Sequence, residues 1–184
     1  TISKSINKYD VEVRLGNFKK NASNIETLEL FNKEMLIVGF GRIGKSLIKR
    51  CLGFDMKVNV YDPFVTAEVI KNFGGNKIEN LEEGLKNCDY LSLHIPLTEK
   101  TKNMINYEKI KSMKKNAVII NTSRGGIINE IDLDIALKNN IIFGAGLDVF
   151  EKEPIDKNNP LINNKKVLLS PHSATFTNEC KSRM

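Results

Sequence analysis

Hydrophobic residues gather in short runs along the chain, and stretches with helical spacing separate these runs. Few polar residues interrupt the runs, which is typical of strands buried on both faces of a parallel sheet. The pattern predicts strands over 35–40, 58–61, a short piece at Ile78, 90–95, 117–120, 143–150 and 166–170. The alternation of strand and helix therefore predicts an α/β fold, a doubly wound parallel sheet with helices on both faces.

Apolar spacing and capping residues predict the helices. Those between the strands are expected over 42–51, 67–73, 80–88, 106–113 and 130–140, with Asn106 as one N-cap. An opening helix is expected where apolar residues recur at helical spacing, at Ile2, Ile6, Tyr9 and Val13. Thr177 is the expected N-cap of a final helix that stops after about one turn. Because the chain also starts without Met, we expect it to be a fragment of a longer protein.

The first expected strand runs into a glycine-rich turn, "GFGRIG", in which Gly39, Gly41 and Gly44 follow the spacing G-x-G-x-x-G. Three glycines alone are a weak signal, but here they follow an apolar strand and open a helix. The first glycine allows a tight turn, the second lets the backbone approach a pyrophosphate, and the third lets the helix pack against the sheet. The helix N-terminus then presents its amides to the phosphates. The turn therefore predicts a dinucleotide site.

The second expected strand ends at an acidic residue, Asp62, which lies 18 residues after Gly44 (62 − 44). This is close to the spacing of the acid that holds a ribose 2′-hydroxyl in dinucleotide sites. A carboxylate there would repel a 2′-phosphate, so the sequence favours NAD over NADP. The alternative is a turn residue before Pro63.

A buried strand in "NAVIINTSRGG" delivers a charged residue, Arg124, to its own end. The carboxyl ends of parallel strands form the ligand crevice of such sheets, and a guanidinium suits a carboxylate ligand. Two glycines, Gly125 and Gly126, follow it, and we expect them to turn the chain away without crowding a bound cofactor. A surface salt bridge is the alternative role for Arg124.

Composition excludes several classes of protein. The net charge of +6 comes from scattered lysines, which form no block typical of a nucleic-acid-binding arm. No apolar run approaches the roughly 20 residues of a membrane span, so neither nucleic acid nor membrane is an expected partner. The three cysteines, Cys51, Cys88 and Cys180, show no metal-ligand spacing and predict free thiols in a cytoplasmic protein.

The chain resembles the D-isomer-specific 2-hydroxyacid dehydrogenases, and within them the 3-phosphoglycerate dehydrogenase branch. The motifs that carry the resemblance occur in the family's order: "GFGRIG", "YDPF", "LHIPLTEKT", "NTSRGGIINE", "GAGLDVFEKEP" and "LLSPHS". The resemblance implies a Rossmann-type NAD-binding domain of a two-domain dehydrogenase that transfers hydride between NAD(H) and a 2-hydroxy or 2-keto acid. It covers nearly the whole chain.

The resemblance also implies three catalytic residues. Arg124 would anchor and polarise the substrate, His172 would exchange the hydroxyl proton, and Glu153 would pair with His172. These roles fit the chemistry, since the reaction needs a cation for the carboxylate and an acid/base of near-neutral pKa.

The NAD contacts that the motifs and the resemblance imply lie at the ends of successive strands, and no metal is expected. They are Gly39, Gly41, Arg42, Ile43, Gly44, Asp62, Ile95, Pro96, Thr101, Thr122, Ser123, Arg124, Asp148, His172 and Ala174. Asp148 has two open roles, either contacting the cofactor or tuning the proton affinity of the histidine. The other histidine, His94, is expected to be a packed or hydrogen-bonded residue at a strand end.

The family's organisation implies an interdomain or dimerisation helix at 1–20, the Rossmann domain at 21–175 and the start of a return helix at 176–184. The substrate domain would be absent, so we expect this chain to bind NAD but to turn over 2-hydroxy acids poorly. A homodimer is expected, and the choice of 2-hydroxy acid stays open. Two alternatives are a non-enzymatic NAD-sensing module similar to corepressors and another NAD enzyme such as an amino-acid dehydrogenase.

Overall fold

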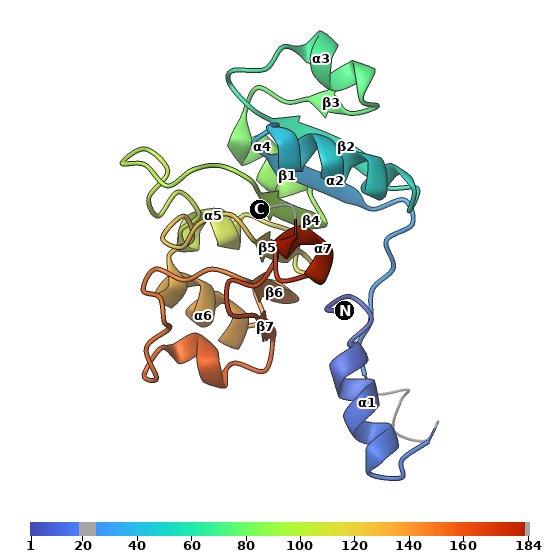
Figure 1. The fold of residues 1–184 in the computed structure, drawn as a ribbon, viewed down its shortest axis with the longest axis vertical. Coiled ribbons are helices and arrows are strands. Elements are labelled where there is room, and N and C mark those ends of the chain that lie inside the picture. The colour runs from blue at the N-terminus through green and yellow to red at the C-terminus, as the bar shows by residue number, and fades with distance from the viewer. Residues whose placement is uncertain (19–24, 183–184) are drawn as a thin grey trace.

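A single parallel sheet organises the molecule, which is described by a computed structural model over residues 1–18 and 25–182 (Figure 1). The sheet order is β3-β2-β1-β4-β5-β6-β7, and its neighbouring strands pair in parallel throughout. The chain reverses its direction of winding between β1 and β4, which is the order of a doubly wound dinucleotide-binding fold. The expected fold class is therefore confirmed. The strands are β1 Glu34–Val38, β2 Lys57–Tyr61, β3 Asn76–Lys77, β4 Tyr90–Leu93, β5 Val118–Asn121, β6 Gly144–Leu147 and β7 Val167–Leu169.

Helices fill the connections, and polar side chains cap several of them. The Asn106 side chain accepts a hydrogen bond from the Lys109 amide, and the Thr177 hydroxyl accepts one from the Cys180 amide, so both expected caps are confirmed. The helices are α1 Ile6–Arg14, α2 Arg42–Leu52, α3 Ala67–Asn72, α4 Leu81–Asn87, α5 Tyr107–Lys111, α6 Glu130–Lys138, α7 Asn178–Lys181 and the 3₁₀ helix η2 Pro160–Asn163.

The core has two parts, one on each face of the sheet. On β1, Leu36 and Val38 belong to the cluster covered by α4, α5 and α6, whereas Met35 and Ile37 belong to the cluster covered by α2 and α3. Successive residues of a strand point to opposite faces, so β1 is buried on both. The unbroken hydrophobic run in the sequence is the consequence of this two-sided burial.

Several strands are shorter than the hydrophobic runs predict. The run 143–150 forms a strand only over Gly144–Leu147, although Val149 and Phe150 are also buried. The Asp148 amide still donates to the Asn121 carbonyl, but the Phe150 amide donates to the Glu153 carboxylate, which turns the chain out of the sheet. Ile78 lies just after β3, where its amide donates to the Val60 carbonyl.

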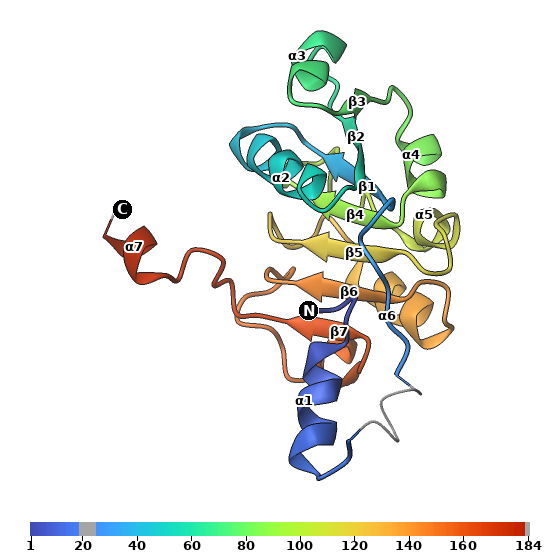
Figure 2. The same cartoon turned by 90° about the vertical axis from the view of Figure 1, so that its right-hand side faces the viewer.

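The two terminal helices lie apart from the sheet. No residue of α1 is buried, and Figure 1 shows it extending from the body of the molecule. Figure 2 shows α7 beyond the edge toward which the arrowheads of the strands point. Residues 19 and 20, which end the expected opening segment, lie outside the described residues. Within the described part of the chain, no helix is long and apolar enough to cross a membrane.

Gly125 has a different purpose from the expected one. A Cβ atom there would lie 1.8 Å from the Phe150 carbonyl oxygen and 2.6 Å from the Glu151 amide nitrogen. The glycine therefore allows the backbones of two loops to cross, one after β5 and one after β6. Gly126 does have the turn conformation, with φ of 78°.

Because backbone atoms cannot move aside as a flexible side chain can, we predict that Gly125→Ala costs about 1–3 kcal/mol of unfolding free energy or more. Urea unfolding measures the loss. Gly53→Ala is the matched control, since Gly53 has a helical φ of −66° and a Cβ atom there would meet no atom closer than 3.4 Å. Equal stability of the two variants would contradict the role of Gly125.

Candidate cofactor and substrate site

The glycine-rich turn between β1 and α2 is built by internal contacts at two of its three glycines. Gly39 has φ of 93°, and a Cβ atom there would lie 2.4 Å from the His94 carbonyl oxygen. A Cβ atom on Gly44 would lie 2.4 Å from the Gly39 carbonyl oxygen. At Gly41 a Cβ atom would meet nothing within 4 Å, and the φ of −74° suits any residue. Packing within the chain therefore does not require a glycine at position 41. The absence of a side chain there leaves the N-terminus of α2 open to an external group.

Asp62 joins the two loops at this end of the sheet. One carboxylate oxygen accepts the Phe40 amide at 2.7 Å and the other accepts the Phe64 amide at 2.8 Å. Each oxygen has a further lone pair, so the carboxylate can also accept a ribose hydroxyl. The geometry shows the alternative role, a turn residue, and leaves the carboxylate able to take the predicted one.

The segment after β4 contains the other histidine, His94, which is half-buried. His94 Nε2 lies 2.9 Å from the Ser92 hydroxyl, and burial lowers the pKa of His94 to about 4. The imidazole is therefore neutral at physiological pH, as expected for a packed strand-end residue. Thr101 is tied to its own loop, because its hydroxyl accepts the Thr98 amide and donates to the Pro96 carbonyl.

The loop after β5 is organised by Asn121, a buried residue that is absent from the predicted site. Its side-chain carbonyl oxygen accepts the Ser123 amide and hydroxyl, and its side-chain amide donates to the Arg124 carbonyl. The Arg124 guanidinium is exposed and donates to the Ser123 carbonyl at 2.7 Å. Among the described residues no carboxylate pairs with it, so its charge is available to an anionic ligand.

The structure brings His172 and Glu153 together, as the resemblance implies. His172 Nδ1 lies 2.7 Å from one Glu153 oxygen, and the other oxygen accepts the Phe150 amide at 3.0 Å. The hydrogen bond from His172, followed by that from Phe150, lowers the pKa of Glu153. The carboxylate therefore stays charged and fixes the orientation of the ring, leaving Nε2 directed elsewhere.

Asp148 holds the loop that contains His172. Its oxygens accept the Ser170 hydroxyl at 2.5 Å, the Ser173 amide at 2.9 Å and the Ala174 amide at 2.9 Å. Burial raises the pKa of Asp148, but these hydrogen bonds outweigh it and lower the pKa overall. They bracket His172, whose φ of 52° is left-handed and unfavourable for most residues. This structural role, stabilising the loop around His172, differs from both roles expected for Asp148, which were contacting the cofactor and tuning the proton affinity of the histidine.

The other predicted contacts lie along the same edge without a partner that defines their role. Arg42 and Ile43 are exposed on the first turn of α2, and Thr122 after β5 and Pro96 after β4 are exposed as well. Ile95 packs partly against the core. No hydrogen bond or ion pair joins Arg124 to the His172–Glu153 pair within the described residues. Nor do those residues contain a cluster of His, Cys, Asp or Glu that could hold a metal ion.

The residues that the sequence-based predictions omitted share one signal. Asn121, Ser170 and Ser173 are small polar residues at or just after strand ends, where such side chains form hydrogen-bonded turns with nearby amides. The position of Asn121, two residues before Ser123, could have predicted its turn. The partnership of Ser170 and Ser173 with Asp148 could not, because more than 20 residues separate them.

Three features define a dinucleotide-binding α/β domain: the sheet order, the glycine-rich turn and the acid after β2. Its ligand edge also carries a cation, Arg124, and the His172–Glu153 pair. The family model for the NAD-binding domain of D-isomer-specific 2-hydroxyacid dehydrogenases matches residues 1–174. The chain therefore belongs to this family, and NAD is its cofactor.

Curated relatives and a solved structure agree with this assignment. D-3-phosphoglycerate dehydrogenase of Methanocaldococcus jannaschii is 42% identical over 84% of this chain, which is 29% of the relative. Glyoxylate reductase of Thermococcus litoralis is 41% identical over 100% of this chain, which is 56% of the relative. D-lactate dehydrogenase of Aquifex aeolicus, solved with NAD and lactic acid, superposes with a TM-score of 0.90 at 34% identity, covering 100% of this chain and 59% of the other. The chain thus spans between 29% and 59% of the length of these proteins.

Gly41 provides a test of the cofactor site that is separate from folding. We predict that Gly41→Ala leaves the melting temperature unchanged, since the added methyl meets no protein atom, but weakens NAD binding at least about tenfold because it stands where the pyrophosphate approaches. Calorimetry measures both quantities. Unchanged affinity for NAD would contradict the placement of the pyrophosphate at this turn.

His94 predicts a loss of stability in acid. Its pKa falls from 6.5 to about 4 on folding, so the unfolded chain binds the proton more tightly. The contribution of the neutral His94 to the free energy of unfolding is therefore complete above pH 6.5 and is lost as the pH falls toward 4. We predict that His94→Gln reduces by about 2 kcal/mol the stability lost between pH 7.5 and pH 5. Urea unfolding at the two pH values measures this, and an equal loss in both proteins would refute it.

Proposed function

We propose that the protein containing this chain is an NAD-dependent oxidoreductase that interconverts a 2-hydroxy acid and its 2-keto acid. The observation that supports it most directly is the His172–Glu153 pair, held at the cofactor edge of the sheet by Asp148 and Phe150. A site that only sensed NAD would have no need of an oriented proton carrier there. The proposed location is the cytoplasm, supported by three free cysteines.

Arg124 is the proposed substrate anchor. Its guanidinium stays charged at any relevant pH and presents paired donors that match a carboxylate. Asn121 fixes the backbone on which it stands, so the cation is mounted on the end of a buried strand. Binding the carboxylate also places a positive charge near the neighbouring carbonyl oxygen, where negative charge develops during reduction.

His172 is the proposed proton carrier. With Nδ1 engaged by Glu153, Nε2 is available to donate a proton to the carbonyl oxygen or to accept one from the hydroxyl. The charged Glu153 holds the ring at Nδ1, so the direction of Nε2 is fixed before a substrate arrives. When bound, NAD supplies or takes up the hydride at the substrate's C2.

The substrate and the oligomeric state belong to the proposal as well. Relatives named D-3-phosphoglycerate dehydrogenase and glyoxylate reductase support a small 2-keto acid as the substrate. An NADH-oxidation screen with phosphohydroxypyruvate, hydroxypyruvate, glyoxylate and pyruvate identifies it.

A homodimer is supported by α1 and the residues after it. They expose the apolar side chains Ile6, Val11, Val13, Leu15 and Phe18, an arrangement typical of an interface.

We predict that His172→Ala in the full-length protein lowers kcat by roughly 10²–10⁴-fold, because the proton transfer loses its carrier. The affinity for NADH should change little. Stopped-flow kinetics and NADH titration by fluorescence measure the two effects, with Glu153→Gln expected to lie between the wild type and His172→Ala. If the His172→Ala protein keeps its function in the cell although it no longer turns over substrate, the protein is a non-enzymatic NAD sensor instead.

A further inference from the structure

We propose that Glu130, at the start of α6, is a positioning residue that holds the Glu153 loop and thereby the His172–Glu153 pair. One Glu130 oxygen accepts the Glu151 amide at 2.7 Å, and the other accepts the Asn159 side-chain amide at 2.5 Å. One carboxylate thus forms hydrogen bonds with both ends of the loop that leaves β6, at Glu151 and at Asn159. The effect on turnover rests on the proposed function, whereas the effect on the pair does not.

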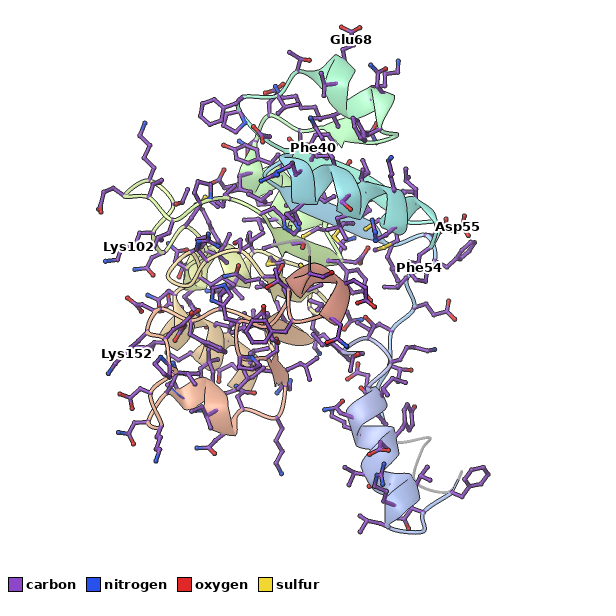
Figure 3. The ribbon with its side chains drawn as sticks, viewed as in Figure 1. Phe40, Phe54, Asp55, Glu68, Lys102 and Lys152 are labelled. Atoms are coloured by element: carbon purple, nitrogen blue, oxygen red, sulfur yellow. The ribbon has the colours of Figure 1, made fainter. Side chains whose placement is uncertain are left out.

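Between these two points the loop is also attached through Ile155, which packs against the core, and through Glu153, which pairs with His172. Within it, Asp156 accepts the Asn158 amide and forms an ion pair with Lys152 at 3.4 Å. That ion pair is exposed, and Figure 3 shows Lys152 extending outward from the molecule. Exposed pairs of this kind contribute roughly 0–1 kcal/mol. The start of the loop therefore depends on Glu130 and on the tight crossing with Gly125.

Gly125 and Glu130 act on the same short segment. The backbone of Phe150 and Glu151 crosses Gly125, while the Glu151 amide is held by Glu130. The Phe150 amide in turn fixes the Glu153 carboxylate. The segment is thus fixed on one side by the residue after Arg124 and on the other by α6, which sets where the acid that orients His172 stands.

Capping of α6 does not account for Glu130. The Asn129 side chain already caps the helix by accepting the Asp132 amide at 3.0 Å. The Asp132 carboxylate bonds the Tyr107 amide on α5. An acid in the first turn gains roughly 0.3–1 kcal/mol from the helix dipole wherever its oxygens point, yet both Glu130 oxygens are directed at the loop.

The hydrogen bonds also determine what a substitution does. Glu130→Gln keeps the shape but turns one acceptor into a donor, which faces either the Glu151 amide or the Asn159 amide. Asn159 cannot flip to accept it, because its own oxygen accepts the Leu161 amide at 3.0 Å and caps η2. Asn159→Asp supplies the missing acceptor and keeps that cap, so the double variant Glu130→Gln/Asn159→Asp restores every bond. Asn159→Asp alone opposes two carboxylates.

The experiment compares the wild type, both single variants and the double variant of the full-length protein. We expect each single variant to lower kcat roughly 10–100-fold, since small displacements of catalytic groups are costly, with NADH affinity unchanged. The double variant should recover to within about threefold of wild type, as coupled sites do. Glu108→Gln is the matched control, since it removes an exposed acid from the first turn of α5.

Carbon-13 NMR titration of Glu153 gives a readout that does not depend on turnover. The pKa of Glu153 is lowered by His172 and Phe150, so it should rise in the single variants and return in the double variant. Singles that match wild type in kcat and in the Glu153 titration, or a double variant no better than the singles, would overturn the proposal. If wild type reduces no 2-keto acid, the proposed function fails while the titration still decides the role of Glu130.

Discussion

The parallel direction of the strands is the constraint on which the site depends. In a parallel sheet every strand ends at the same edge, so residues far apart in the chain are delivered to one place. Gly39, Asp62, Arg124, Asp148 and His172 each follow a different strand of this sheet. The register of the strands places their loops along one edge, although Gly39 and His172 also adopt backbone conformations with positive φ.

That shared edge creates a problem of hydrogen bonding which acidic and amide side chains solve. Chain segments that leave a buried sheet carry amides with no strand partner, and an unpaired buried amide costs free energy. Asp62, Asn121, Asp148 and Glu130 each accept amides from such segments. The same side chains therefore complete the fold and fix the loops before any ligand arrives, so that less ordering is left for the moment of binding.

Features set by neighbouring residues could be predicted from the sequence, whereas contacts between distant segments could not. Apolar runs predict the strands because burial on both faces requires apolar residues at most positions of β1 and β5, and caps such as Asn106 act over three residues. The bond between Glu130 and Asn159 joins residues 29 apart, and neither residue's neighbours indicate the other. Gly125 shows the same limit, since its nearest atoms belong to Phe150 and depend on how β5 and β6 pair.

These long-range contacts explain why the edge tolerates a strained backbone at His172. A left-handed conformation costs roughly 1–2 kcal/mol for a residue with a side chain, and His172 adopts one between Ser170 and Ser173. Three hydrogen bonds to one buried carboxylate exceed that cost at about 1 kcal/mol each or more for a charged acceptor. Asp148 can still contact a ligand, because a carboxylate has about four acceptor sites, but its first task is to make the conformation of His172 the stable one. The position of His172, the proposed proton carrier, is therefore set by the fold, before cofactor or substrate contributes anything.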